Sequence, residues 1–553
     1  MKKLVLSAAV AFLATSTAMA QDNRDVSAQS GNDNTATTTQ DGDSNENYLL
    51  QWGDENTSTV SQTGDENLST SAQFGTNNTG TITQEGTENT SALLQMGANN
   101  TADINQKDKT NSSAVTQDGT GNIADVDQWG EGNTSVLSQE GNRNNATISQ
   151  TTGTTRVSDF NTSIAEQIGD DNTLVVSQLN NGNNTSTSLQ DGNDNYAKVT
   201  LNGVDNKTNV TQEGDHNTVE TFQNYRSNEL TITQEGNNNT ATEFTIGNYN
   251  ESFVSQDGDR NTSVIERNEN RQWGGAPQSH NGKAFVDQTG DDNTSMITQV
   301  GNRNIIDIDQ IGDDNHSDVN QAGDDNTADV NQTFLANNNN ADIDQIENLN
   351  TATVNQTLRS AWNTATIAQD GMENTATVNQ SLNSNDNNAE IAQLGNSNEA
   401  TVNQIGTLLF LSSENNDAMI VQSGDSNEAT TNQSFRSSDN EAFIGQFGND
   451  NEATITQNGS LFAANHSNEG TIFQFGNENL GTITQTGSSH ESLLVQLNNE
   501  NTANIMQSGT NNAAMNLQWG DMNTATVTQS GADQFHFGSQ VGNGNTLTVT
   551  QSN

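Results

Sequence analysis

A glutamine recurs at every eleventh position over long stretches of the chain, and this spacing constrains the fold more than any other feature. In the first part of the sequence glutamines stand at positions 29, 40, 51, 62, 73, 84, 95, 106, 117, 128, 139 and 150. The unit reads Gln-x-Gly-x-x-Asn-x-Ala/Ser-x-aliphatic-x-Gln and continues to Gln551. A short unit repeated this often predicts a repeat architecture, in which each unit is one small element that stacks on its neighbours.

Within one unit the asparagine, the small residue, the aliphatic residue and the glutamine stand at i, i+2, i+4 and i+6, which is the periodicity of a β-strand. These four side chains are expected on one inward face, and the polar residues between them on the outward face. The Gly-x-x step is expected to be a tight turn. Two units then make one turn of about 22 residues. The predicted fold class is all-β, a two-strand-per-turn β-solenoid of cross-β type that stacks end to end into a fibre.

The low hydrophobic content requires a substitute for an ordinary apolar core. Only 29% of the 553 residues are hydrophobic, whereas a globular chain of this length normally builds several cores. Stacked turns would bring identical Asn and Gln side chains into columns, where their amides hydrogen-bond along the stack. The predicted ladder residues are represented by Gln51, Asn56, Gln62, Asn89, Gln95, Asn326, Gln332, Asn374 and Gln380, and the predicted turn glycines by Gly53, Gly64, Gly323 and Gly371.

Departures from the eleven-residue spacing indicate where turns are longer. Between Gln332 and Gln474 long turns alternate with short ones, so they are expected along one edge. Segment 267–288 is irregular and contains Pro277; if Gln278 ends a degenerate unit, the chain has 46 units in 23 turns, and every long turn shares that edge. Apolar residues on this edge either pack locally or form a lateral contact with another filament or surface. The candidates are Phe334, Leu358, Leu382, Phe410, Phe435 and Phe462.

The charge and composition exclude several classes of function. The formal net charge of −53 would repel nucleic acid, and the absence of cysteine excludes disulfides and thiolate chemistry. We single out no catalytic arrangement and no cofactor, and expect a protein that is not an enzyme. Acidic pairs in neighbouring turns are weak candidates for bridging calcium or form a solvated charged face; they are Asp291, Asp292, Asp313 and Asp314.

Residues 1–20 have the pattern of a Sec signal peptide, with Lys2 and Lys3 before an apolar stretch and Ala18-Met19-Ala20 before Gln21. We therefore expect cleavage after residue 20 and a secreted chain. No other segment approaches the length of apolar residues needed for a membrane span. Residues 21–553 are expected to form a single solenoid.

The unit Gln369-Asp-Gly371-Met-Glu-Asn374-Thr-Ala376-Thr-Val-Asn-Gln380 resembles the curlin repeat of bacterial curli fibre subunits. The resemblance covers essentially the whole chain after the leader, with an unusually large number of repeats. It implies a functional amyloid that passes through the periplasm and forms extracellular, cell-surface fibres for biofilm matrix and adhesion. The implied partners are further copies of the chain, an outer-membrane export channel, a nucleator, and host or matrix surfaces.

Two alternatives use the same fold. One is a monomeric surface adhesin with a solenoid stalk. The other is an ice-binding solenoid, suggested by outward threonine pairs such as Thr351 and Thr353, although Asp342, Asp344 and Glu390 interrupt such an array. The regular terminal units favour self-assembly, since an uncapped sheet edge recruits another strand.

Overall fold

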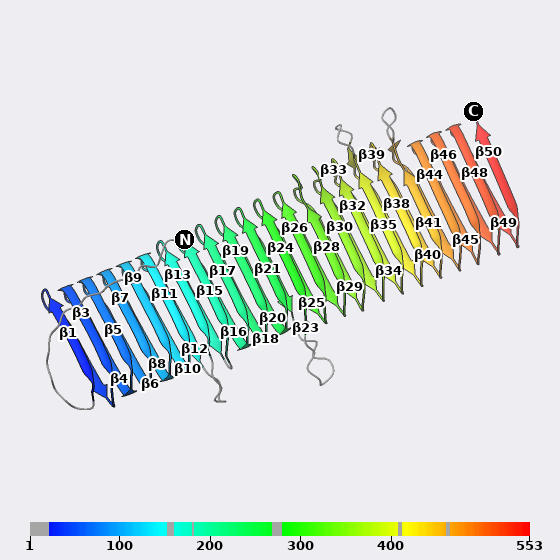
Figure 1. Cartoon of the computed structure of the whole chain (residues 1–553). Helices are drawn as coiled ribbons and strands as arrows, with labels where there is room; N and C mark the ends of the chain where they lie inside the picture. Colours follow the sequence, from blue (N-terminus) through cyan, green and yellow to red (C-terminus); the bar gives the residue numbers. More distant parts are fainter. Residues whose placement is uncertain (1–21, 152–159, 180–181, 268–278, 407–411, 460–464) are drawn as a thin grey trace. The chain divides into compact units, whose positions relative to one another are not determined.

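The computed structural model describes residues 22–151, 160–179, 182–267, 279–406, 412–459 and 465–553. These residues form strands and turns and contain no helix. They divide into two compact units, unit 1 up to Asp205 and unit 2 from Asn206 onward. Each unit is a β-solenoid of two parallel sheets with two strands in each turn, and the units together contain about 23 turns of about 22 residues (Figure 1). The predicted two-strand-per-turn solenoid and its number of turns are confirmed.

The strands of unit 1 alternate between two sheets. Sheet 1A contains β1 (Arg24–Ser30), β3 (Glu46–Asp54), β5 (Leu68–Thr76), β7 (Thr90–Ala98), β9 (Ser112–Thr120), β11 (Thr134–Asn142), β13 (Thr162–Ile168) and β15 (Thr185–Asp191). Sheet 1B contains β2 (Thr35–Asp41), β4 (Thr57–Asp65), β6 (Thr79–Thr87), β8 (Thr101–Lys109), β10 (Ile123–Glu131), β12 (Asn145–Thr151), β14 (Thr173–Leu179) and β16 (Tyr196–Val204).

Unit 2 has the same arrangement. Sheet 2A contains β17 (Lys207–Glu213), β19 (Glu229–Glu235), β21 (Glu251–Asp257), β24 (Lys283–Thr289), β26 (Ile305–Ile311), β28 (Thr327–Gln332), β30 (Thr351–Thr357), β32 (Thr375–Ser381), β35 (Glu399–Ile405), β38 (Glu428–Ser434), β41 (Glu452–Gln457), β44 (Leu480–Ser488), β46 (Thr502–Thr510), β48 (Thr524–Ala532) and β50 (Thr546–Ser552). Sheet 2B contains β18 (Thr218–Arg226), β20 (Thr240–Asn248), β22 (Thr262–Arg267), β25 (Thr294–Val300), β27 (His316–Ala322), β29 (Asn340–Ile346), β31 (Thr364–Asp370), β34 (Asn388–Leu394), β37 (Asp417–Ser423), β40 (Glu441–Phe447), β43 (Glu469–Phe475), β45 (Glu491–Leu497), β47 (Ala513–Trp519) and β49 (Phe535–Val541). Two-residue strands lie in the longer turns: β23 (Ser279–His280), β33 (Ser384–Asn385), β36 (Ser413–Glu414), β39 (Ser437–Ser438) and β42 (Asn465–His466).

Paired strands are parallel and in register, so that each position of the repeat lies beside the same position of the repeat in the next turn. Gln29 of β1 pairs with Gln51 of β3, and Gln51 pairs with Gln73 of β5. A parallel stack of identical units places like residues together because the side-chain period is two and any slip by one residue would turn the inward set outward. The register therefore produces the columns of identical side chains that the sequence predicts.

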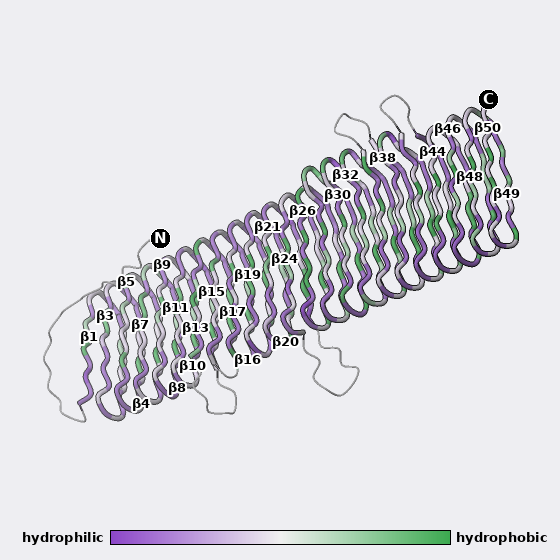
Figure 2. The backbone as a smooth tube through the Cα atoms, turned by 45° about the vertical axis from the view of Figure 1, so that its right-hand side comes forward, coloured by the Kyte–Doolittle hydropathy of each residue, from purple (hydrophilic) through white to green (hydrophobic). Residues whose placement is uncertain are grey.

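The core of each unit is a thin layer between its two sheets. Aliphatic residues such as Val60 and Ile104 are fully buried, and the inward asparagines and glutamines beside them are equally buried. Figure 2 shows the resulting alternation of hydrophobic and hydrophilic residues along the strands. Burial of so many amides is tolerated only where their hydrogen bonds are satisfied inside the protein.

The prediction of a degenerate unit ending at Gln278 is wrong, although that residue itself lies outside the described ranges. Strand β21 pairs directly with β24, and β22 pairs directly with β25, so sheet 2A has no place for another strand between Gln256 and Gln288. The turn after Arg267 therefore leads from sheet 2B to sheet 2A. The long turns after Gln332 and Gln356 lead from sheet 2A to sheet 2B, which is the opposite edge of the unit. The prediction that all long turns share one edge is consequently wrong as well.

Candidate functional site

The ladder glutamines form columns of hydrogen bonds that run in one direction. Nε2 of Gln51 donates to Oε1 of Gln73 at 2.8 Å, and also to the backbone oxygens of Thr35 and Asn56 at 3.0 and 3.1 Å. The same donation to the glutamine of the following turn recurs at Gln62, Gln95, Gln332 and Gln380, at 2.9, 2.9, 2.8 and 2.8 Å. Each buried amide thus satisfies its donors within the stack and offers its oxygen to the preceding turn.

The ladder asparagines form a second column with the opposite direction. The backbone N–H and Nδ2 of Asn56 both donate to Oδ1 of Asn34 in the preceding turn, at 3.0 and 3.1 Å. Nδ2 of Asn56 donates in addition to the backbone oxygen of Gly75 at 2.9 Å, which ties the strand to the turn beyond it. Asn89, Asn326 and Asn374 have equivalent partners in the turns before and after their own.

The predicted turn glycines are required by both conformation and space. The φ angles of Gly53, Gly64, Gly323 and Gly371 are 122°, 108°, 134° and 130°, a region that L side chains rarely adopt. A Cβ added to Gly53 would lie 2.0 Å from the backbone oxygen of Gly75, and one added to Gly371 would lie 2.0 Å from that of Gly395. The turns can stack at strand spacing only because these positions have no side chain.

A further ladder in the turns was not part of the sequence analysis. The residue after the turn glycine, usually Asp or Asn, accepts a hydrogen bond from the backbone N–H of the same position one turn earlier. Asp291 accepts from the N–H of Asp259 at 2.9 Å, and Asp313 accepts from that of Asp291 at 3.0 Å. The recurrence of Asp or Asn at this position is the sequence signal that would have revealed the ladder.

The side chains of three of the four metal candidates have other partners. Asp291 and Asp313 are part of this turn ladder, and Asp292 binds Arg260 through two hydrogen bonds of 2.7 and 2.6 Å. The Arg260 guanidinium holds the pKa of Asp292 below its ordinary value. Asp314 has a left-handed backbone, with φ of 57°. Over the described residues no group of three or more His, Asp or Glu side chains is arranged to hold a metal ion.

Four lateral-contact candidates lie in long turns that lead from sheet 2A to sheet 2B. Phe334, Leu358 and Phe435 are exposed and Leu382 is half-buried, whereas Phe410 and Phe462 lie outside the described residues. Neighbouring turns are joined through their backbones, since the N–H of Leu358 donates to Thr333 and that of Leu382 to Thr357. A hollow of about 350 Å³ lies among these long turns. Its lining residues are Phe334, Leu335, Leu358, Arg359 and Asn383.

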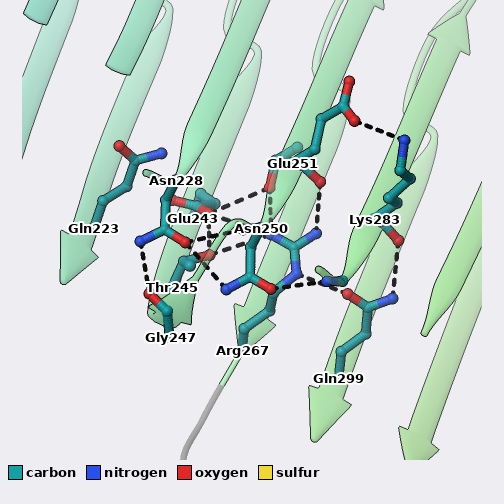
Figure 3. A network of polar contacts seen from close by, with 12 residues as sticks. Gln223, Asn228, Glu243, Thr245, Gly247, Asn250, Glu251, Arg267, Lys283 and Gln299 are labelled. Atoms are coloured by element: carbon teal, nitrogen blue, oxygen red, sulfur yellow. Dashed lines mark hydrogen bonds and ion pairs between the residues drawn. The ribbon is translucent and has the colours of Figure 1, made fainter. Parts of the chain in front are cut away.

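A buried ion pair interrupts the glutamine column of sheet 2B. The column continues from Gln223 to Thr245 of β20 and Arg267 of β22, and then returns to Gln299. Nε of Arg267 donates to Oε1 of Gln299 at 2.7 Å, and its Nη1 donates to Oγ1 of Thr245 at 3.2 Å (Figure 3). The long guanidinium fills the space that the short threonine leaves.

Glu243 compensates the charge of this arginine. It occupies an inward position that is aliphatic in most other repeats. Its Oε1 lies 3.6 Å from Nη1 of Arg267 and accepts hydrogen bonds from the hydroxyls of Thr245 and Ser252. Burial raises the pKa of Glu243 to about 7, against the opposing effect of the arginine charge. Burial likewise lowers the pKa of Arg267 to about 10.

Aspartates on the outward face of sheet 2A form a crowded acidic patch. Asp307 pairs in register with Asp329, and Asp309 with Asp287. Partial burial, and then the neighbouring carboxylates, raise the pKa of Asp307, Asp309 and Asp329 above the ordinary value. In-register stacking therefore creates charge repulsion that is smaller when these groups are protonated.

The outward side chains of β37, β40, β43, β45, β47 and β49 form a surface that was missed by the sequence analysis, and we call it the 2B apolar face. The rings of Phe443 and Phe473 have centroids 5.1 Å apart, and those of Phe447 and Phe475 are stacked at 5.0 Å. Figure 2 shows the hydrophobic colour around β49. The signal in the sequence is that alternate repeats near the C-terminus carry Phe, Leu, Met or Val at outward positions where other repeats have Thr, Asn or Asp.

The described residues include no helix long and apolar enough to cross a membrane. Among curated proteins none matches the sequence significantly. Eight segments, which together make up about half of the chain, match the curlin associated repeat: residues 31–64, 75–107, 119–151, 226–266, 301–333, 414–459, 466–497 and 499–531. This family and its β-solenoid fold are structural rather than catalytic. The repeated Gln and Asn ladders, the turn glycines and these matches show that the chain belongs to the curlin-repeat family.

Proposed function

We propose that this protein is a secreted structural subunit that assembles end to end into extracellular amyloid fibres, which serve as biofilm matrix and in adhesion. The observation that carries the proposal is the polarity of the glutamine columns. Gln29 and Gln40 in the first described turn donate to Gln51 and Gln62, so their own Oε1 atoms face away from the stack. Gln551 in the last described turn accepts from Gln529, so its Nε2 faces the opposite way, toward the surface that β50 presents. The two end surfaces are therefore complementary to each other.

Membership in the curlin-repeat family supports the same proposal. On this basis the first 20 residues direct export to the periplasm, and an outer-membrane channel and a nucleator assist release and assembly. The exposed turn residues Phe334, Leu358 and Phe435 are then available to contact a host or matrix surface.

Seeded growth tests the proposal. The mature chain, desalted and monomeric, is followed by thioflavin fluorescence with and without preformed fibres as seeds. A lag phase that seeds abolish, ending in detergent-resistant fibres, is expected. A persistent monomer with a flat trace would instead favour the adhesin stalk.

A matched pair of variants identifies the growing surface. Val549 of β50 points inward and Thr548 points outward. Val549→Lys places a charge in the surface that the next copy must cover, whereas Thr548→Lys places the same charge outside it. We expect Val549→Lys to slow elongation at least tenfold and Thr548→Lys to leave it nearly unchanged, because burial of an unpaired charge is costly. Equal elongation rates for the two variants would contradict end-to-end assembly through β50.

A further inference from the structure

The 2B apolar face differs from the face of sheet 2A on the same turns. The outward residues of β45 are Leu493, Val495 and Leu497, and β49 carries Phe535 and Phe537. In sheet 2A the corresponding residues of β44, β48 and β50 are mostly threonines. The repeat alone does not produce this asymmetry, because both sheets are built from the same unit. Most of the exposed apolar residues of these turns lie on sheet 2B, and sheet 2A carries only Leu480 and Met506 among its exposed large hydrophobic residues there.

The face is large, and its side chains are half-buried or exposed. Trp519, Phe537 and Val541 are 56%, 60% and 69% exposed. Six strands at a spacing of ~4.8 Å and seven residues at ~3.3 Å each cover roughly 650 Å². Two such faces packed together would bury about 1,300 Å², which reaches the size of specific protein interfaces. An exposed and mostly apolar surface of this extent indicates an interaction site.

From this geometry we infer that the 2B apolar face packs against the same face of a second copy, forming a dry sheet-to-sheet contact that joins two chains laterally. Flat parallel sheets with in-register side chains can interdigitate at a sheet separation of ~10 Å. The same patch on both copies is the requirement for a two-fold interface. This contact is separate from the end-to-end contact that the proposed function uses.

An acidic column along one edge of the face determines the orientation. Asp417, Glu441, Glu469 and Glu491 occupy the first outward position of successive strands and lie beside one another. If the strands of the two copies ran in the same direction, these columns would meet and repel. A two-fold axis parallel to the stacking direction reverses the strands of the partner and places the two columns at opposite edges. The lateral pair therefore has parallel stacks.

Cross-linking of the full chain tests this contact, and the natural absence of cysteine makes single thiols specific probes. Val495→Cys lies near the centre of the face, and Thr484→Cys lies at a comparable outward position of sheet 2A. A bismaleimide with an arm of about 10 Å, the sheet separation, is added to each assembled variant. We expect covalent dimers from Val495→Cys at least fivefold more than from Thr484→Cys.

A second set of variants removes the apolar residues without removing the repeat. The triple variant Phe473→Thr, Phe475→Thr and Leu493→Thr is compared with Thr482→Ser, Thr484→Ser and Thr526→Ser on sheet 2A. We expect electron micrographs of the first to show single stacks in place of paired ones, with seeded elongation unchanged, and those of the second to keep the pairs. Equal cross-linking of the two cysteine variants, or pairs that survive the loss of the phenylalanines, would overturn the inference. Soluble cross-linked dimers without fibres would support it and would instead contradict the proposed function.

Discussion

Arg267 and Glu243 form an ion pair inside the solenoid, with Nη1 of the arginine 3.6 Å from Oε1 of the glutamate and both side chains fully buried. Neither residue belongs to the repeat, since Arg267 replaces a ladder glutamine and Glu243 replaces an aliphatic residue. Each compensates for the other, because a lone charge in either position would be unpaired in the core. The two departures therefore form one structural feature (Figure 3).

This coupling predicts strongly non-additive effects on stability. Arg267→Gln alone leaves Glu243 buried without a cation, and should destabilise the surrounding turns by roughly 3–5 kcal/mol. The double variant Glu243→Val and Arg267→Gln restores the repeat residues and is expected to be at least as stable as the natural chain. Amide hydrogen exchange in β20, β22 and β25 measures the change in local stability for the single and the double variant. Arg303→Gln, which removes an exposed pair with Asp325, is the control and should change protection by less than ~1 kcal/mol. Additive losses in the double variant would refute the coupling.

Substitution of a turn glycine should be costly beyond its effect on backbone conformation. In Gly371→Ala the new Cβ would lie 2.0 Å from the backbone oxygen of Gly395, so the two turns must separate. Gly544→Ala is the matched control, because Gly544 also has a positive φ, of 67°, yet an added Cβ meets nothing within 4 Å. We expect about 1 kcal/mol of lost stability for Gly544→Ala from conformation alone, and clearly more for Gly371→Ala. Chemical denaturation of the soluble chain, followed by circular dichroism, gives the comparison.

Loss of one ladder glutamine should weaken the turns on both sides of it. Gln332→Leu removes the acceptor of Gln310 and the donor to Gln356, leaving buried amide groups without partners. Such a group costs about 1–3 kcal/mol. Reduced amide protection is expected in β26, β28 and β30. The adjacent outward substitution Asn331→Leu serves as control and should leave protection of the buried amides nearly unchanged; an equal loss in both variants would show that the ladder contributes little.

Acidification should favour the folded, stacked state through the patch on sheet 2A. The pKa values of Asp307, Asp309 and Asp329 are raised by folding, so their contribution is fully present below the ordinary value of 3.8 and is lost as the pH rises through the raised values. Assembly is therefore expected to be faster near pH 4 than at pH 7. Replacing all three by Asn should shorten the lag at pH 7 and flatten its pH dependence.

The control for this pH effect removes the same net charge elsewhere. Asp450, Asp521 and Asp533 lie in turns; Asp521 and Asp533 accept hydrogen bonds from Asn499 and Asn511, which the oxygen of an Asn can also accept. The corresponding triple Asn variant should keep most of the pH dependence of the lag time, measured by thioflavin fluorescence. If both triple variants flatten it equally, total charge rather than the crowded patch controls assembly.

Much of the fold follows from the spacing of a few residues. The period of eleven, the strand alternation and the glycine two residues after most ladder glutamines were sufficient to predict two strands per turn, the inward set represented by Gln51 and Asn56, and the turn position of Gly53. This is because every turn buries the same Asn and Gln amides. Only an in-register parallel stack gives hydrogen-bond partners to the buried amides of all turns at once. The spacing near Gln278 misled the assignment of the long turns to one edge, because an insertion and a degenerate unit have the same length in sequence.

The tertiary structure decided what depends on which turns become neighbours. Arg267 and Glu243 stand far apart in the repeat pattern, and only the stacking of β20 on β22 brings their charges together. The 2B apolar face likewise arises because every second unit lies in the same sheet, so residues such as Phe443 and Phe473, 30 positions apart in sequence, share one surface. The sequence by itself determined the repeated strand and turn, since these depend on local periodicity. The ion pair and the face depend on contacts between turns, which exist only in the folded stack.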